Sequence, residues 1–546
     1  GPVRLPEHAP LETGPQPSQP RQPQILKEPQ PPLENKPEES LVAPADIPSS
    51  KWRPHIEGTT PYSTEQLQKI LSSCGRPTVA DTLNICAAKL TARLVRDGYV
   101  NSRVFTLATP SPGALEVVEG RIAELRIKSP DLGLQKEIKK RLNSLIGSVL
   151  HLPSLEKALV NVRSMPGVGQ ITGNLGRLGS DATQAKLSLT VDPAPTPWLG
   201  EVSIRNDGNI GTGEWRSIAT VMKNNLVKRN DNFLAYFEMN SDSDPELGAT
   251  ITSTSYTWPL SENWRLIGSF GHSRRQLVEA SDDAHEISFR QLQAMGQVET
   301  TLYRSTNQLW SAFAGISGNR NDSYLAGDSI PLVLGGGPDG WLRSGYLRGG
   351  INFSGSIKDL AWNSNIYGLQ GIAGFSTESQ LKELAWFGIN PGEARAIGGL
   401  ANLHWGLSPN VILKLRGAGQ WAFNHLPSDM GFSIGSDVGL RGLPGSLISG
   451  DSGWLGVSEL IMTAWRKDDQ ALQIVPFLGM GGVRTDFNDI VFEDTIGSGG
   501  ILTRYYKGSW MLELGWVNSF ESSDNQGIWQ EWLLGDGLYA HLKYRF

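Results

Sequence analysis

The clearest pattern in the sequence is an alternation of apolar and polar residues that begins near Trp198 and continues to the last residue. In the final segment the apolar positions share one face: Leu538, Ala540, Leu542, Tyr544 and Phe546. The polar positions between them share the other face: His541, Lys543 and Arg545. Because successive side chains of a strand point to opposite sides, this pattern predicts a strand with two unlike faces.

Two earlier segments indicate what each face meets. In residues 411–423 the apolar face is formed by Val411, Leu413, Leu415, Trp421 and Phe423. In residues 510–516 it is formed by Trp510, Leu512, Leu514 and Trp516. The opposite faces carry charges, which the core of a soluble sandwich would exclude and a water-filled barrel accepts. The residues expected to face the lumen are Lys414, Arg416, Glu513, His541, Lys543 and Arg545.

The alternation predicts an all-β transmembrane barrel of about 16 antiparallel strands over residues 196–546. The strands are expected to begin near residues 197, 214, 231, 248, 263, 286, 308, 343, 359, 394, 410, 454, 471, 498, 509 and 537. No helical period is expected after Trp198. One connection, residues 425–453, is long for a loop without structure of its own, and such loops are usually functional.

The first 195 residues follow other patterns. Residues 1–50 hold 13 of the 33 prolines, which predicts a flexible linker. Helical periods at 63–73 and 80–97 precede strand-like runs at 103–108 and 114–119. A strand at 121–128, helices near 134–147 and 153–165, and strands near 168–176 and 184–192 repeat that order. We therefore predict two βααββ domains, at 51–120 and 121–195.

Composition removes several classes of function. The 49 basic and 55 acidic residues are nearly balanced, so a nucleic-acid partner is not expected. No run of about 18 apolar residues predicts a membrane-spanning helix. The eight histidines show no metal-ligand spacing. Gly450, Asp451, Ser452 and Gly453 are similar to a serine-protease nucleophile loop, but no histidine sits in a partner motif. We expect no catalysis, no metal and no cofactor.

Two βααββ domains followed by a sixteen-strand barrel resemble the two-partner secretion transporters, the TpsB family of POTRA-bearing outer-membrane transporters. The segments 94–104 and 113–122 are similar to the end of the first POTRA helix pair and to the hinge into the second POTRA domain. Leu440, Arg441, Gly442 and Leu443 stand where the family carries Val-Arg-Gly-Tyr/Phe at the tip of its sixth loop. The resemblance covers about residues 55–546.

The resemblance implies a transporter in a Gram-negative outer membrane, with its POTRA domains in the periplasm. Such a transporter recognises an unfolded TpsA-like exoprotein, which is an adhesin, a haemolysin or a contact-dependent toxin, and secretes it without nucleotide hydrolysis. Outer-membrane lipids, periplasmic chaperones and the barrel-assembly machinery are the expected partners in biogenesis. A barrel-inserting assembly factor is the alternative within the superfamily, although such factors tend to carry more POTRA domains. A passive porin, the third alternative, would not need residues 55–195.

Several residue roles follow from the same resemblance. Residues 440–443 are implied to be the gating tip of the loop, and residues 450–453 belong to the same loop. The family's partner for the loop arginine is an aspartate, but Gly481 stands at that position. The substitutes considered are Asp437, Asp451, Glu459 and Asp486. The final strand, with Leu542, Tyr544 and Phe546, is implied to be the barrel-assembly signal.

Two expectations concern the N-terminal half. Cys74 and Cys86 are either a disulfide, as a periplasmic location permits, or two buried thiols. Many family members carry a cysteine pair in the first POTRA domain. The family often has an N-terminal plug helix, but residues 1–50 show no helical period, so we expect none here. No signal peptide opens the sequence, and we expect the mature form of an exported protein.

Overall fold

The computed structural model describes residues 54–72, 74, 82–107, 113–165, 167–279, 286–305, 307–333, 335–336, 339–520 and 528–546. The predicted proline-rich linker, and with it the question of a plug helix, lies outside these residues. The chain divides between Pro195 and Thr196 into an N-terminal unit and a C-terminal unit, and each is described by itself.

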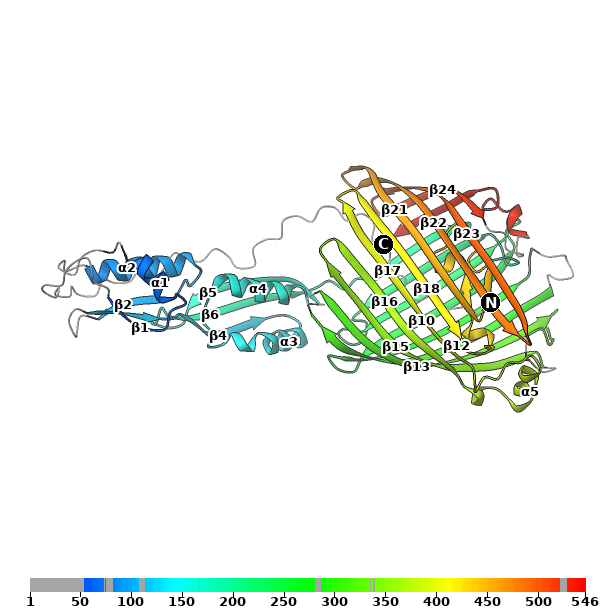
Figure 1. Cartoon of the computed structure of the whole chain (residues 1–546), viewed down its shortest axis with the longest axis horizontal. Coiled ribbons are helices and arrows are strands. Elements are labelled where there is room, and N and C mark those ends of the chain that lie inside the picture. The colour runs from blue at the N-terminus through cyan, green and yellow to red at the C-terminus, as the bar shows by residue number, and fades with distance from the viewer. Residues whose placement is uncertain are drawn as a thin grey trace. The chain divides into compact units, whose positions relative to one another are not determined.

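The first module of the N-terminal unit is a three-stranded sheet covered by two helices (Figure 1). Its elements are β1 (His55–Gly58), α1 (Thr64–Leu71), α2 (Thr82–Arg96), β2 (Arg103–Leu107) and β3 (Ala114–Val118). The sheet order is β1-β3-β2, with β1 parallel to β3. Ser63 caps α1 through a capping box with Gln66. Leu90, Leu94 and Leu115 are fully buried at the centre of the module.

The second module repeats this plan. Its elements are β4 (Arg121–Lys128), α3 (Leu132–Leu142), η1 (Asn143–Leu145), α4 (Leu152–Arg163), β5 (Val168–Arg177) and β6 (Gln184–Pro193). The sheet order is β4-β6-β5, with β4 parallel to β6. Asp131 caps α3, and Leu134, Ile138 and Leu187 are fully buried in a core of its own. The predicted order of helices and strands is therefore present twice.

The two modules are joined by direct contacts at the end of α2. The Leu152 amide donates to the Gly98 carbonyl, and the rings of Tyr99 and His151 stack with their centroids 4.5 Å apart. Gly98 has a φ of 98°, in the left-handed region that favours glycine. Beside it, hydrogen bonds from Tyr62 and Arg93 lower the pKa of Asp97 from its usual value. The segment 94–104 therefore fixes one module on the other.

Cys74 and Cys86 form a disulfide that lies in the core of the first module, in contact with the α2 residues there. Replacing both cysteines with serine should lower the free energy of unfolding of the N-terminal unit by about 3 kcal/mol, because an open loop of this length has more freedom when unfolded. Denaturant melts of that unit check the value. Wild-type protein under reducing conditions should match the variant, and equal midpoints of the oxidised and reduced forms would contradict the prediction.

The C-terminal unit is a closed antiparallel barrel, which confirms the predicted fold class. In Figure 1 its strands are strongly tilted around the barrel wall. Sixteen strands form the wall: β7 (Leu199–Arg205), β8 (Trp215–Asn224), β9 (Asn232–Ser241), β10 (Leu247–Pro259), β11 (Trp264–Gln276), β12 (Ile287–Arg304), β13 (Gln308–Leu325), β15 (Trp341–Ile357), β16 (Leu360–Gly371), β17 (Arg395–Ser408), β18 (Val411–Ala422), β21 (Ser452–Lys467), β22 (Gln470–Phe487), β23 (Ile490–Lys507), β24 (Trp510–Phe520) and β25 (Leu538–Arg545). The two-residue strand β14 (Asp328–Ser329) pairs with β13.

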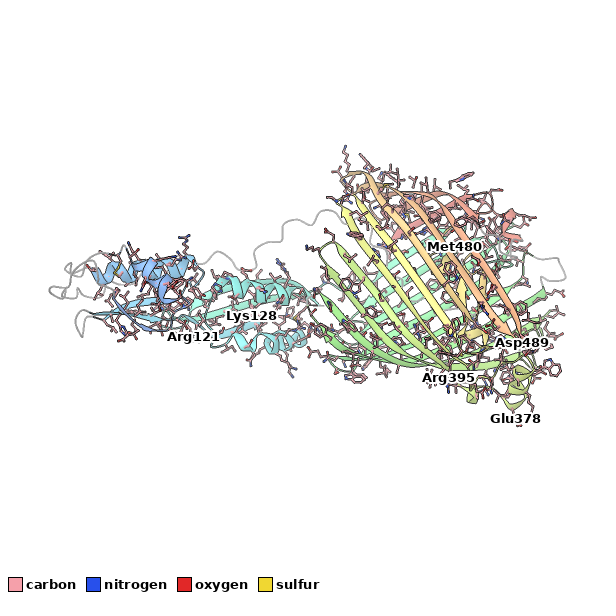
Figure 2. The ribbon with its side chains drawn as sticks, in the orientation of Figure 1. Arg121, Lys128, Glu378, Arg395, Met480 and Asp489 are labelled. Atoms are coloured by element: carbon pink, nitrogen blue, oxygen red, sulfur yellow. A yellow bond between two sulfur atoms is a disulfide. The ribbon has the colours of Figure 1, made fainter. Side chains whose placement is uncertain are left out.

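The strands begin close to the predicted residues, except for β23. It begins at Ile490 and not near residue 498. Asn488 and Asp489, both with positive φ, form a two-residue turn after β22, and Figure 2 marks Asp489 there. Ile490, Val491 and Phe492 are consecutive apolar residues, all exposed. The period of two is lost over these residues, and the start of the strand was therefore missed.

The two ends of the barrel differ in their connections, although the two-residue turn at Asn488 and Asp489 lies at the end that also carries the longest ones. One end carries short turns, such as residues 358–359, 409–410, 468–469 and 508–509. The other end carries long connections, such as residues 372–394 and 423–451. Outer-membrane barrels have short periplasmic turns and longer extracellular loops. The first wall strand, β7, starts at the short-turn end.

The expectation that no helix follows Trp198 is wrong at one place. Helix α5 (Glu378–Trp386) lies beyond the end of the barrel wall (Figure 1), and Figure 2 marks its first residue. Thr377 and Gln380 form a capping box, and Leu384 packs with Leu342. The Thr-x-x-Gln pattern was the available signal.

The two faces of the wall differ as the alternation predicts. Trp510, Leu512, Leu514 and Trp516 are exposed on the outer side of β24, whereas Glu513 is buried on the inner side. The interior along β21 to β25 is, however, less wet than expected. His541 and Lys543 are only 9% and 7% exposed. They are covered because a loop fills this part of the lumen.

The barrel closes between its last and first strands, where β25 pairs with β7 over five residue pairs. The amide and carbonyl groups of Phe546 and Gly200 exchange two hydrogen bonds, of 2.9 and 3.0 Å. Arg545 Nε lies 2.9 Å from Glu201 Oε2 across the same junction. The terminal residue is therefore part of the closure.

Deleting Phe546 should lower the amount of assembled barrel in the membrane several-fold, because both closing hydrogen bonds and the terminal aromatic side chain are lost. Heat-modifiable mobility of the membrane fraction on gels measures assembly. Phe546→Tyr keeps the ring and the backbone, and it should assemble normally. Undiminished barrel after the deletion would show that the residue is dispensable.

Candidate functional site: a loop folded into the barrel

The connection between β18 and β21, residues 423–451, folds against the inner wall, and we call it the inner loop. It contains η4 (Ser428–Met430), β19 (Phe432–Ile434), η5 (Ser436–Val438) and β20 (Ile448–Gly450), and β19 pairs with β20. Six of its apolar side chains are buried in one cluster with the wall: Phe432, Ile434, Leu440, Leu443, Leu447 and Ile448. They pack on inward-facing apolar residues of the wall, among them Val457, Phe477, Leu502 and Val517. The loop and this part of the wall share one core.

Glycines in the wall make room for the inner loop. A Cβ atom on Gly481 would lie 2.7 Å from Ile434 Cδ1 and 2.9 Å from Trp454 O, closer than real contacts allow. A Cβ atom on Gly479 would meet the side chain of Leu440. An aspartate at position 481 would therefore collide with the loop. This explains why the position that the resemblance assigns to an acid carries glycine here.

Arg441, at the tip of the inner loop, binds two glutamates of the wall. Its Nε lies 2.6 Å from Glu459 Oε1 on β21, and its Nη1 lies 3.1 Å from Glu513 Oε1 on β24. Glu459 was one of the four acids considered, whereas Glu513 was expected only to face the lumen. The predicted gating residue thus has carboxylate partners on two strands.

A second arginine completes this cluster. Arg504 on β23 pairs through Nε with Glu513, and its Nη2 lies 3.9 Å from Glu459 Oε2. Glu459, Arg504 and Glu513 are all nearly buried, so two guanidinium groups and two carboxylates neutralise one another away from water. Removing one member of such a buried group leaves an uncompensated charge, which is strongly destabilising. His541 Nδ1 lies 3.8 Å from Glu513 Oε1 at the margin of the cluster.

The backbone of the tip is fixed at two further points. The Ser498 hydroxyl donates a hydrogen bond to the Arg441 carbonyl. Gly442 has a φ of 84°, and a Cβ atom there would lie 3.0 Å from Val517 Cβ. Both the conformation and the space require glycine after Arg441. Leu440 and Leu443, on either side, are fully buried.

A second ion pair holds the inner loop to the first strands of the barrel, β8 and β9, beyond the junction of β25 with β7. Asp437 Oδ1 lies 2.6 Å from Arg216 Nη1 on β8, and Arg216 Nη2 lies 2.6 Å from Glu238 Oε1 on β9. The Gly445 amide donates to the Gly208 carbonyl at 2.8 Å. Asp437 was considered as a partner of Arg441, and this is wrong: its partner is Arg216.

The base of the inner loop is fixed around Asp451. Its Oδ2 lies 2.6 Å from His425 Nδ1, and its amide donates to the Thr485 hydroxyl. Gln420 Nε2 donates to the carbonyls of Met430 and Asp451. The Ser452 hydroxyl accepts a hydrogen bond from the Ala422 amide. Asp451 is therefore a partner of the loop base and not of Arg441.

The remaining candidate residues lie elsewhere on the wall. Asp486 pairs with Arg484 at an exposed position. Asp486 is therefore not the partner of Arg441. Lys414 and Arg416 lie on the inner face of β18, and Lys414 stands opposite Glu459 in the ladder. A Cβ atom on Gly439 of the inner loop would lie 3.4 Å from Arg416 Cδ. Arg416 is thus beside the loop tip.

Sequence comparison identifies the family. The family described as haemolysin secretion/activation protein ShlB/FhaC/HecB matches residues 184–498, more than half of the chain. This chain belongs to that family. A search of curated proteins gives no significant match.

Solved structures agree with the family at the level of the fold. CdiB from Escherichia coli is 17% identical, with a TM-score of 0.60 over 94% of this chain and 93% of that one. CdiB from Acinetobacter baumannii is 16% identical, with a TM-score of 0.56 over 95% and 94%. BamA from Haemophilus ducreyi lacking POTRA domains 1–3 is 12% identical, with a TM-score of 0.54 over 93% and 100%.

The chain is therefore a two-partner secretion transporter, one of a family of outer-membrane barrels with a secreted TpsA-like partner. Its family is one of transporters and is not known for catalysis. Within the described residues, no helix has the length and apolar character needed to cross a membrane.

Three charged residues of this transporter's site were missed from the sequence: Arg504, Arg216 and Glu238. Arg504 stands directly opposite Glu513 in the β23–β24 ladder. Opposite charges at facing positions of neighbouring strands were the available signal. Arg216 and Glu238 lie on the neighbouring strands β8 and β9 but not at facing positions, because Arg216 stands opposite Asn240. Their third partner, Asp437, is more than 190 residues away in the sequence.

Proposed function

We propose that this transporter exports one unfolded exoprotein and that the inner loop is its gate. The observation that supports this most directly is the buried pairing of Arg441 with Glu459 and Glu513 inside the barrel. The loop occupies part of the lumen that a chain in transit would need. A buried network of balanced charges can hold the loop tip against the wall. Because each ion pair of the network strengthens the others, the tip is expected to detach in one cooperative step.

The two N-terminal modules are proposed to receive the exoprotein in the periplasm. The peptide that leaves the second module enters β7 at the short-turn end, which is periplasmic in barrels of this kind. Each three-stranded sheet has edge strands, β1 and β2 in the first module and β4 and β5 in the second. An extended segment can add to such an edge through main-chain hydrogen bonds without demanding a particular sequence.

Export is proposed to need no nucleotide hydrolysis. The sequence contains no Gly-x-x-x-x-Gly-Lys-Ser/Thr motif. Folding of the exoprotein outside the cell would then bias its motion outward, because a folded chain cannot return through the pore. Periplasmic chaperones, the barrel-assembly machinery and outer-membrane lipids are proposed to act in the biogenesis of the barrel.

Co-expression with a candidate TpsA-like exoprotein tests the proposed function. The exoprotein should reach the medium only when the transporter is present, and it should do so when cellular ATP is depleted after synthesis. An assembly factor would instead change the levels of other barrels in the membrane. A porin would pass small solutes and leave the exoprotein in the periplasm.

A reversible lock tests the gate. Leu440→Cys with Gly479→Cys places one thiol on the loop tip and the other where a side chain would touch it. Under oxidising conditions secretion should fall at least tenfold, because the tip cannot leave the wall. A reductant should restore it, and each single variant should secrete at its own constant level under both conditions. Equal secretion in the oxidised and reduced double variant would show that the tip stays in place during export.

A further inference from the structure

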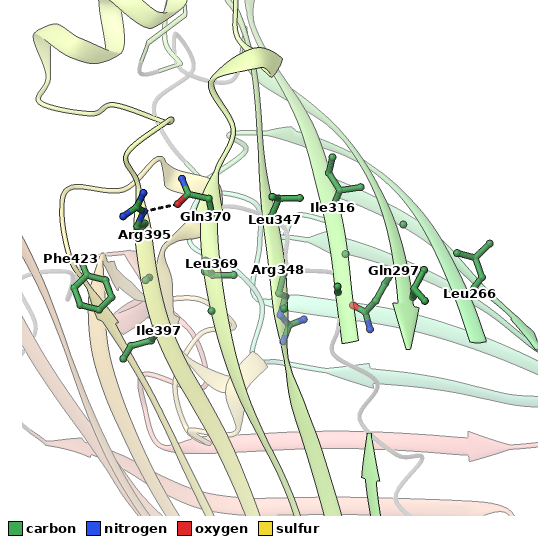
Figure 3. Close-up of a pocket in the computed structure, with 17 residues that line it drawn as sticks. Leu266, Gln297, Ile316, Leu347, Arg348, Leu369, Gln370, Arg395, Ile397 and Phe423 are labelled. Atoms are coloured by element: carbon green, nitrogen blue, oxygen red, sulfur yellow. Dashed lines mark hydrogen bonds between the residues drawn. The ribbon is translucent and has the colours of Figure 1, made fainter. Parts of the chain in front are cut away.

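The outer face of the barrel carries an apolar groove across β11 to β18, with a volume of about 760 Å³ (Figure 3). Six exposed apolar side chains line it: Leu266, Val298, Ile316, Leu347, Ile397 and Phe423. The residues between them on the strands face the interior. Arg348, for example, lies over the rings of Phe313 and Tyr367. The groove is therefore a shallow hollow that opens toward the membrane.

The floor of the groove is formed by glycines that the fold itself does not require. A Cβ atom on Gly296 or Gly368 would meet nothing within 4 Å, and one on Gly349 would make only an ordinary contact. None of the three has a positive φ. Glycine weakens a strand interior and often marks the close approach of another molecule. Here the missing side chains create the hollow.

One end of the groove lies at the outer boundary of the membrane. Arg395 and Trp405 are ten residues apart on the outer face of β17, which corresponds to about 33 Å along a strand and about 25 Å along the normal of a tilted barrel. Trp405 belongs to the short-turn end and is exposed. Arg395 directly follows the long connection that contains α5. Arg395 thus stands at the level of the headgroups of the outer leaflet.

Hydrogen bonds hold the Arg395 guanidinium in an orientation that suits an anion. Its Nε donates to Gln370 Oε1 at 2.7 Å, as the dashed line in Figure 3 shows, and Gln370 Nε2 donates to the Gly392 carbonyl. Among the described residues, Nη1 and Nη2 of Arg395 have no hydrogen-bond or ion-pair partner. Gln370 holds the guanidinium at the mouth of the groove. A planar guanidinium with two free nitrogens fits a phosphate.

We propose that this groove is a binding site for a phosphorylated glycolipid of the outer leaflet. One acyl chain lies on the glycine floor, and a phosphate of the headgroup binds Arg395. The apolar lining, the opening toward the bilayer and the positive charge at headgroup level all match this ligand. The groove lies on the outer face of the wall and touches the base of the inner loop, since Phe423 lines it and the Arg395 amide donates to Asn424 Oδ1. The tip of the loop, with Arg441, binds the inner face of other strands, so the groove does not require the proposed gate. It would hold one lipid against the transporter.

Native mass spectrometry of the full chain with added lipid A tests the acyl site. Wild-type protein should retain one tightly bound lipid, and Gly296→Leu with Gly368→Leu should reduce the retained fraction at least tenfold. Both substitutions fill open space and should leave the barrel folded. Gly456→Leu on the outer face of β21 is the matched control, because its Cβ atom also meets nothing within 4 Å. Equal retention by the filled and control variants would overturn the proposal.

The phosphate contact is tested separately. Arg395→Gln should abolish the preference for lipid A over its dephosphorylated form. The variant should retain the phosphorylated lipid about tenfold less than the wild type does. Wild-type protein should also prefer lipid A to phosphatidylglycerol. An unchanged preference in Arg395→Gln, or equal retention of phosphatidylglycerol by the wild type, would overturn the assignment of the ligand. Secretion measured in parallel separates this site from the gate, since a failed gate leaves lipid retention intact.

Discussion

Replacing Arg441 with alanine should reduce secretion of the exoprotein at least tenfold and should change the conductance of single pores. The substitution leaves Glu459 and Glu513 with Arg504 as the remaining guanidinium of the cluster. Loss of one partner from a buried ion pair costs about 3–5 kcal/mol, which is enough to detach the loop tip from the wall. Immunoblots of the medium measure secretion, and planar bilayers measure conductance.

Two variants separate the role of Arg441 from a general loss of charge. Arg441→Lys keeps the charge but cannot reach two carboxylates in the same geometry, so it should give an intermediate result. Arg484→Ala removes an exposed arginine that also pairs with two acids, Asp486 and Glu493, and it should behave as the wild type. Heat-modifiable mobility must show an assembled barrel in every case. Wild-type secretion and conductance from Arg441→Ala would rule out the loop tip as the gate.

Deleting residues 55–195 should leave an assembled barrel in the membrane and lower secretion below detection. Assembly should survive because the sixteen strands close on themselves between β25 and β7, and each N-terminal module has a separate core. Secretion should fail because the edge strands proposed to receive the exoprotein are removed. Membrane fractions show the barrel, and the exoprotein is followed in the periplasm and in the medium.

The deletion also separates the alternative functions. A porin without its N-terminal unit should still pass small solutes at the wild-type rate, and a transporter should leave its exoprotein in the periplasm. The full-length chain expressed at the same level is the control for the amount of barrel. Normal secretion by the truncated chain would show that the barrel, and not the two N-terminal modules, recognises the exoprotein.

Much of the fold was predictable because it depends on local periodicity. Alternation with a period of two fixes which residues face outward, as at Trp510 and Glu513, and it locates most strand starts within two residues. It fails at Ile490, where three apolar residues follow one another. It also fails at α5, since nine residues between two strands are too few to show a helical period.

The contacts of the candidate site were less predictable, because they join distant parts of the sequence. Arg441 was identified from its motif, but Glu513 lies 72 residues further along the chain. Which acid it meets depends on barrel closure and on the path of the loop. The same holds for Asp437, whose partner Arg216 lies 221 residues earlier. The lumen was expected to be filled with water. The inner loop covers part of the inner wall, but nothing in the sequence of the wall strands indicates that a loop packs on them.

The balance of charges around Arg441 has a consequence for what happens when the inner loop leaves. The wall then keeps Glu459, Glu513 and Arg504, with Lys414 opposite Glu459 in the ladder, and both glutamates have lost their pairing with Arg441. Arg441 is a tethered ligand of these two glutamates, and a short tether gives an effective concentration of about millimolar. A basic segment of the passing chain competes with it only while that segment is held nearby. Reclosure is therefore intramolecular and independent of how many transporters the membrane contains.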